Sequence, residues 1–135
     1  MSVVKQSEVE CEKMNKDIYS DERLGFVIAC LLSQAITIDE FNDWAGRALL
    51  LEGAPNFLVD LADFHEAPFK VYRVIGYVPD WTLERSVEHA IIGIAVSRGI
   101  IPFEMPISRD EALESIRSNK LVCDMFSMEF PLIRI

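Results

Sequence analysis

Three acidic residues, Asp39, Glu40 and Asp43, lie close together in the stretch TIDEFNDWAGRALLLEG, residues 37–53. Carboxylates grouped in this way can bind a divalent cation or act as a general acid and a general base. The spacing excludes a calcium-binding EF-hand loop. Counting from Asp39, the sixth position is Trp44 and the twelfth is Leu50, where such a loop requires Gly and Glu.

The same three carboxylates fit the beginning of a helix. Thr37 and Glu40 have the T-x-x-E spacing of a capping box, in which each side chain accepts a hydrogen bond from the backbone N–H of the other residue. Asp39 falls in the first turn, where negative charge interacts favourably with the helix dipole. Asp43 precedes Arg47 by four positions, a spacing at which two side chains can form an ion pair. The stretch therefore predicts helix architecture and no catalytic or metal site.

Other reactive side chains also lack a known catalytic or metal-binding pattern. His89 lacks the Glu-x-x-His spacing of helical metal sites, since Ser86 stands three positions before it. Cys30 lies in the apolar run FVIACLL, where a buried thiol is unreactive, and Cys123 is next to Asp124, whose charge raises a thiol pKa. Neither a G-x-S-x-G motif nor a Gly-rich phosphate loop occurs. The sequence predicts no catalytic residue, metal or cofactor, with a small enzyme whose site is gathered from distant residues as an alternative.

Short helices are the elements expected to position these residues. A chain of 135 residues, 50% apolar and 26% charged, has the size and composition of one globular domain, which we take as residues 1–135, including a polar lead at 1–19. Apolar residues recur at helical spacing, and they lie on most sides of the stretch 20–34, which we therefore expect to form a central helix. Ser108 and Glu111 have the spacing of a second capping box, and Gly99 marks a helix end. We predict an all-α fold of five to six short helices, within residues 20–34, 37–53, 55–64, 79–100 and 108–120.

Two further stretches are less determined by their pattern. Residues 68–78, PFKVYRVIGYV, are rich in residue types that favour strands, yet Val71, Val74, Ile75 and Val78 match the helical spacing. We favour a helix for residues 68–78, with a short strand or extended segment there or at the C-terminus as the alternative. The apolar tail, residues 121–135, is expected to pack onto the core, and Pro131 argues against a helix running to its end.

The net charge of −9 is concentrated in the first half of the chain, where residues 1–65 carry 12 acidic and 5 basic side chains. Such a field repels nucleic acid and anionic membranes, and it attracts a basic protein surface. The longest apolar run, residues 24–32, is too short to span a membrane. The N-terminal residues lack the apolar stretch of a secretory signal, and the three cysteines suit a reducing compartment, so a cytoplasmic location is expected.

Carboxylates and tryptophans are the candidates for a protein-binding surface. Asp60 and Asp63 are three positions apart in an expected helix, so they share a face. Tryptophan is prominent among the residues that dominate protein interfaces, although Trp44 and Trp81 can equally seal the core. The candidate partner-binding residues are Asp39, Glu40, Asp43, Trp44, Asp60, Asp63 and Trp81.

A set of residues within about 33–61 forms a recognisable pattern: Thr37-Ile38-Asp39-Glu40-Phe41, Trp44-Ala45, Pro55, Phe57-Leu58 and Asp60-Leu61. The pattern is similar to one in small helical bacterial proteins, some of which resemble the immunity proteins encoded beside polymorphic or contact-dependent toxins. This resemblance implies a protein that neutralises a cognate toxin by binding it, without catalytic residues.

The sequence thus predicts an immunity protein whose acidic surface binds a basic toxin, such as a nuclease domain, in a one-to-one complex. The alternative is a helical adaptor or self-associating regulatory module. In that case the apolar tail FPLIRI, residues 130–135, and Trp81 would form an interface between copies of the chain.

Overall fold

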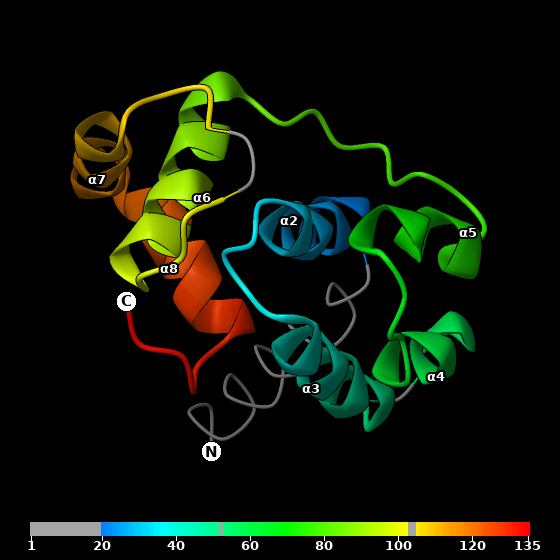
Figure 1. Ribbon diagram of the computed structural model, residues 1–135. Coiled ribbons are helices and arrows are strands. Elements are labelled where there is room, and N and C mark those ends of the chain that lie inside the picture. Colours follow the sequence, from blue (N-terminus) through cyan, green and yellow to red (C-terminus); the bar gives the residue numbers. More distant parts are fainter. Residues whose placement is uncertain (1–19, 52, 103–104) are drawn as a thin grey trace, which may run out of the picture.

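Seven α-helices make up most of the computed structural model, which describes residues 20–51, 53–102 and 105–135 (Figure 1). No strand occurs in these ranges, so the predicted all-α class is confirmed. The expected polar lead, residues 1–19, lies outside them. The helices are α2 (Asp21–Leu32), α3 (Ile38–Leu49), α4 (Phe57–Ala62), α5 (Val71–Ile75), α6 (Arg85–Ser97), α7 (Arg109–Ser118) and α8 (Lys120–Glu129), with a 3-10 helix η1 (Pro68–Lys70) before α5.

Local capping chemistry accounts for where several helices begin and end. Both predicted capping boxes form, Thr37 with Glu40 at the start of α3 and Ser108 with Glu111 at the start of α7. At the other end, Gly99 adopts a φ of 82° just after α6, and the next residue donates its N–H back to the carbonyl of Ala95 at 3.0 Å. This is the left-handed closure that glycine favours at helix ends. The predicted stop at Gly99 is therefore confirmed.

Residues 68–75 are helical, as the apolar spacing favoured, whereas residues 76–78 lie outside the helix. η1 leads directly into α5, which ends after five residues because Gly76 takes the left-handed conformation, with a φ of 86°. The buried side chains of Val71 and Ile75 are one turn apart and face the core.

Two details differ from the sequence prediction. First, α6 begins at Arg85, and Trp81 stands before it in an irregular segment that also contains Asp80, whose backbone N–H donates to the Asp21 carboxylate at 3.1 Å. Second, the tail forms α8, so there is one helix more than expected. The side chain of Asn119 caps α8 by accepting from the N–H of Val122 at 3.2 Å, and the helix ends before Pro131.

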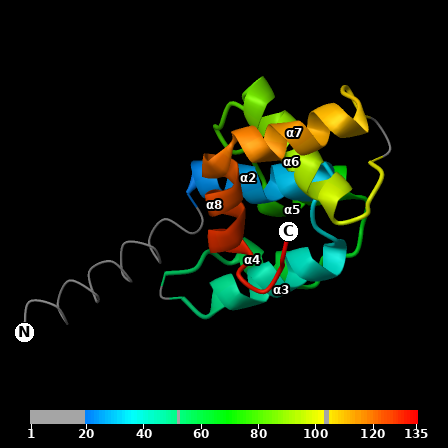
Figure 2. The same cartoon turned by 90° about the vertical axis from the view of Figure 1, so that its left-hand side faces the viewer.

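The core is built around α2, which is apolar on almost every side. Figure 2 shows α2 between the α6–α7 pair and the α3–α4 pair, with α8 crossing one end of α2. This arrangement confirms the central position expected for residues 20–34 and explains why few polar residues occur within α2. Its fully buried side chains are Leu24, Phe26, Val27, Ile28, Cys30 and Leu31.

Candidate functional site

The acidic residues of α3 divide into two sets with different roles. Glu40 completes the capping box and also accepts both ends of the Arg98 guanidinium, at 2.8 Å and 2.6 Å. Arg98 lies just past the end of α6 and donates further to the carbonyl of Ala35 at 2.7 Å. Glu40 therefore ties α3 to α6, and its carboxylate is largely engaged within the fold.

The pKa of Glu40 reflects these contacts. Partial burial acts to raise the pKa, but the hydrogen bonds from Arg98 and Thr37 and the positive charge of Arg98 outweigh it, so the pKa lies below its ordinary value. The carboxylate is thus held in its charged form as part of the α3–α6 junction.

Asp39 and Asp43 lie on the solvent side of the same helix, and both are exposed. The predicted ion pair between Asp43 and Arg47 is wrong, since the ion pairs among described residues do not include it. Arg47 instead donates to the backbone carbonyl of Glu129 at 3.4 Å, which draws its guanidinium toward α8. Neither aspartate side chain makes a hydrogen bond or ion pair with another described residue.

Asp60 and Asp63 lie on the exposed side of the neighbouring helix α4 and just after its end. The two helices pack together (Figure 1), and the Asn42 amide of α3 donates to the carbonyls of Leu61 at 2.9 Å and Phe64 at 3.0 Å. Asp39 and Asp43 thus lie on one helix, and Asp60 and Asp63 lie on and just after the helix that packs against it. We call Asp39, Asp43, Asp60 and Asp63 the α3–α4 acidic surface.

Trp44 does not belong to this surface, and its prediction as an exposed anchor is wrong. Its side chain is only 1% exposed, and its indole Nε1–H donates to the Glu129 carboxylate at 2.8 Å. The other carboxylate oxygen of Glu129 pairs with Nε of Arg23. These contacts join α3, α8 and α2 around a buried charge, so Trp44 is a structural residue.

Trp81 is partly buried and lies against α2. Its ring meets the Phe26 ring edge-on, with centroids 6.3 Å apart, and a Cβ placed on Gly25 would come within 2.8 Å of it. The indole thus covers a bare stretch of the α2 backbone, which favours the core-sealing role over that of an anchor. The more exposed side chains in this segment are Tyr77, at 41%, and Val78, at 69%.

The cysteines behave as their surroundings in the sequence suggested. Burial raises the pKa of the Cys30 thiol well above its ordinary value, and the nearby charge of Glu129 adds to this effect. Burial and then the charge of Asp124 raise the pKa of the Cys123 thiol. Cys11 lies outside the described residues. Within the described ranges, no group of three or more His, Cys, Asp or Glu side chains is placed so that it could hold a metal ion.

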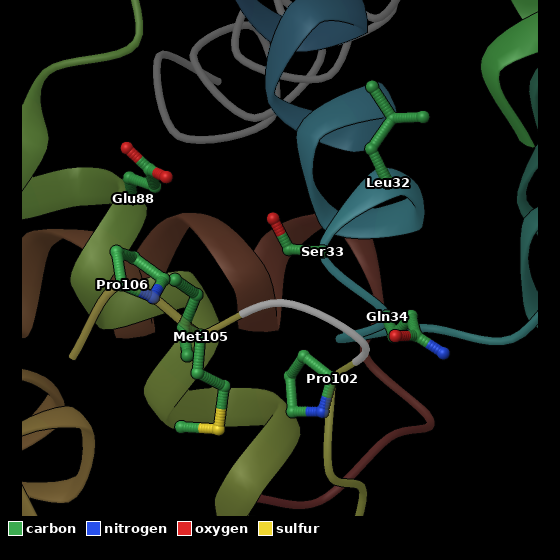
Figure 3. Close-up of a pocket in the computed structure, with 8 residues that line it drawn as sticks. Leu32, Ser33, Gln34, Glu88, Pro102, Met105 and Pro106 are labelled. Carbon is green, nitrogen blue, oxygen red and sulfur yellow. The ribbon is translucent and has the colours of Figure 1, made fainter. Parts of the chain in front are cut away.

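A hollow on the described part of the molecule was not anticipated from the sequence. It has a volume of about 550 Å³ and lies between the C-terminal end of α2, the first half of α6 and the segment before α7 (Figure 3). The Glu88 carboxylate and the Ser33 hydroxyl lie on opposite walls, and Glu88 is the one titratable side chain among the described lining residues. We call this hollow the α2–α6 groove, lined by Leu32, Ser33, Gln34, Glu88, Ile92, Pro102, Met105 and Pro106.

Comparison with protein-family models, curated proteins and solved structures found no match for the chain. No helix in the described ranges has both the length and the apolar character needed to cross a membrane. The chemistry of its own residues is therefore the basis for assigning a function.

Proposed function

We propose that this chain is an immunity-type inhibitor that binds a basic protein toxin in a one-to-one complex and has no catalytic activity of its own. The observation that carries the proposal is the α3–α4 acidic surface, where four exposed carboxylates gather on two adjacent helices and form no side-chain hydrogen bond or ion pair with described residues. A surface of one sign speeds association with a partner of opposite sign and disfavours partners of like sign. The overall charge of −9 acts in the same direction.

Charge reversal on α3 tests this surface directly. Because Asp39 and Asp43 are exposed, the double variant Asp39→Lys/Asp43→Lys should keep the fold and lose affinity for the partner. A control with the same charge change exists on α7, where Asp110 and Glu114 are also exposed and occupy the same second and sixth positions of their helix. Glu114 pairs with Arg117 at 3.4 Å, but this pair is exposed to solvent and contributes little to stability. The control variant Asp110→Lys/Glu114→Lys changes the net charge equally, so a general charge effect would weaken both variants alike.

The partner is to be identified by purifying the tagged chain from its native host and determining which protein is recovered in one-to-one ratio. That protein is then expressed in cells with and without the chain. The partner should be toxic when it is expressed alone. Cells should grow when the wild-type chain or the α7 control variant is also expressed, and the Asp39→Lys/Asp43→Lys variant should fail to protect them. A recovered partner that is not toxic, or equal protection by both variants, would contradict it.

The self-associating module is a second candidate, favoured by apolar side chains that remain exposed near the C-terminus. Leu132 is 87% exposed and Ile135 is 46% exposed, whereas Phe130 in the same tail is buried. Deleting the tail would remove Phe130 from the core, so the sharper test is Leu132→Ser/Ile135→Ser. Sedimentation at several concentrations should show a dimer in the wild type that dissociates in this variant. A wild-type monomer at all concentrations would remove this candidate.

A further inference from the structure

We propose that the α2–α6 groove binds the cationic side chain of an arginine or lysine presented by a partner protein. The identity of that protein as the biological occupant rests on the function proposed above, whereas the affinity of the groove for a cation is a property of this chain alone. The groove is distinct from the α3–α4 acidic surface, because none of the four aspartates lines it.

Two independent sources of negative potential meet at the groove. The first is the Glu88 carboxylate, which is partly buried on one wall. The second is the C-terminal end of α2, which supplies Leu32, Ser33 and Gln34 to the opposite wall. The carbonyl end of a helix carries a partial negative charge, and the last turn of this 12-residue helix contains no basic residue of its own.

No cation of the chain already occupies this position among the described lining residues, which include neither Lys nor Arg. Arg98 donates to the carbonyl of Ala35, just after α2, and to the Glu40 carboxylate. Glu88 takes part in none of the ion pairs among the described residues, so its charge is available to a group from another molecule.

The rest of the lining suits the aliphatic stem of a long basic side chain. Ile92 lies one turn beyond Glu88 on α6 and also lines the groove. Pro102, Met105 and Pro106 line it as well, and Figure 3 shows Pro106 and Met105 below Glu88. Arginine and lysine side chains bury their methylene groups along apolar surfaces while the charged head group meets a polar partner. Methionine adapts its shape to different contacts, which suits such a binding surface.

The form of the groove favours a side chain held by a protein over a free small cation. Glu88 is the one full charge on a wall that is otherwise mostly apolar, so a free ligand would gain a single charged contact. A side chain tethered to a bound partner arrives at high effective concentration and pays less for this contact.

Titration with an arginine probe tests the inference without knowing the partner. The ¹⁵N-labelled full chain is titrated with N-acetyl-arginine methylamide and, separately, with the neutral near-isostere N-acetyl-citrulline methylamide. We expect saturable shifts of the backbone signals of Ser33, Gln34, Glu88 and Ile92 with the arginine probe, and at least fivefold weaker binding of citrulline. Binding should weaken further at high salt, which screens charge.

A matched pair of variants assigns the effect to the groove. Glu88→Gln should weaken binding of the arginine probe at least fivefold. Glu84→Gln on the same helix should leave it unchanged, because Glu84 is exposed, caps no backbone N–H through its side chain and does not line the groove. Equal binding of the two probes, equal effects of the two variants, or shifts confined to the α3–α4 acidic surface would overturn the inference.

The outcomes separate this inference from the proposed function. If the arginine probe binds the groove but the chain protects no cell from its co-purified partner, the proposed function fails and the cation site stands. If the chain protects cells but the probe does not bind, and Glu88→Lys protects as well as the wild type, the groove inference fails and the proposed function stands.

Discussion

Gly93 lies where α6 passes closest to α7, and Gly93→Ala is expected to destabilise the protein by about 1–3 kcal/mol, the usual cost of overpacking. A Cβ at this position would come within 2.2 Å of the carbonyl oxygen of Ala112 and 2.4 Å of Cγ1 of Ile116. The oxygen belongs to the α7 backbone and cannot rotate away as a side chain can. Because ordinary contacts of a Cβ begin near 3.4 Å, the two helices would have to separate by about 1 Å. That movement would loosen the small cluster formed by Ile92, Val96 and Ala112.

Gly46, in the interior of α3, is the matched control because an added Cβ would meet nothing within 4 Å. Gly46→Ala removes only the entropic cost of glycine in a helix, so it should stabilise the protein by roughly 0.5–1 kcal/mol. Gly93→Ala makes the same entropic gain, so the variant is less stable than the wild type only if the cost of the steric clash is larger than this gain. Urea unfolding followed by circular dichroism measures both variants, with a lower midpoint for Gly93→Ala and a higher one for Gly46→Ala at unchanged slope. If Gly93→Ala were as stable as the wild type, the close packing of α6 on α7 would be refuted.

Three further predictions concern buried or partnered polar groups. Glu129→Gln should destabilise the protein by about 1.5–3 kcal/mol in the same urea assay, because the buried carboxylate would lose its charge-assisted contact with Arg23; a loss below about 0.5 kcal/mol would contradict this. The lowered pKa of Glu40 contributes stability that is present above its unfolded pKa and is lost as the pH falls through the folded pKa. The unfolding free energy of Glu40→Gln should therefore fall less on acidification than that of the wild type. An unchanged pH profile would count against the ion pair with Arg98. The thiol pKa values of Cys30 and Cys123 are raised, so iodoacetamide at pH 7.5 should alkylate both more slowly in the folded protein than in the urea-unfolded chain. In the folded protein Cys30 should react more slowly than Cys123, and peptide mass spectrometry resolves the two sites. Equal rates in the folded protein would refute the burial argument.

The parts of the fold that could be predicted from the sequence are those set by contacts between near neighbours. A capping box needs only two residues three positions apart, and Thr37 with Glu40 gave the start of α3 correctly. The left-handed turn at Gly99 is equally local. The apolar spacing of α2 predicted a central helix because a helix that is apolar on most sides can only be stable inside a core.

Contacts between distant residues explain what the sequence did not reveal. Glu129 looks like an isolated acid in an apolar tail, and its partners Arg23 and Trp44 are 106 and 85 positions away. The pair between Arg98 and Glu40 spans 58 positions. No periodic or capping pattern marks such pairs, so Trp44 was assigned to the surface. The one available signal was the acid itself, since a carboxylate in an apolar segment needs a buried partner.

Some polar side chains of α3 stabilise the fold, whereas its exposed aspartates do not. Glu40 performs the capping and joins α3 to α6, and Trp44 and Arg47 reach toward α8, so this side of the helix is explained by the fold. Asp39 and Asp43 are one turn apart with like charge, an arrangement that destabilises a helix by roughly 0.2–0.5 kcal/mol. The helix dipole compensates for Asp39 in the first turn, but Asp43 lies beyond that turn and has no ion-pair partner among described residues. Stability alone therefore gives no reason for a carboxylate at position 43, which makes the α3 charge reversal the most direct test of a basic partner.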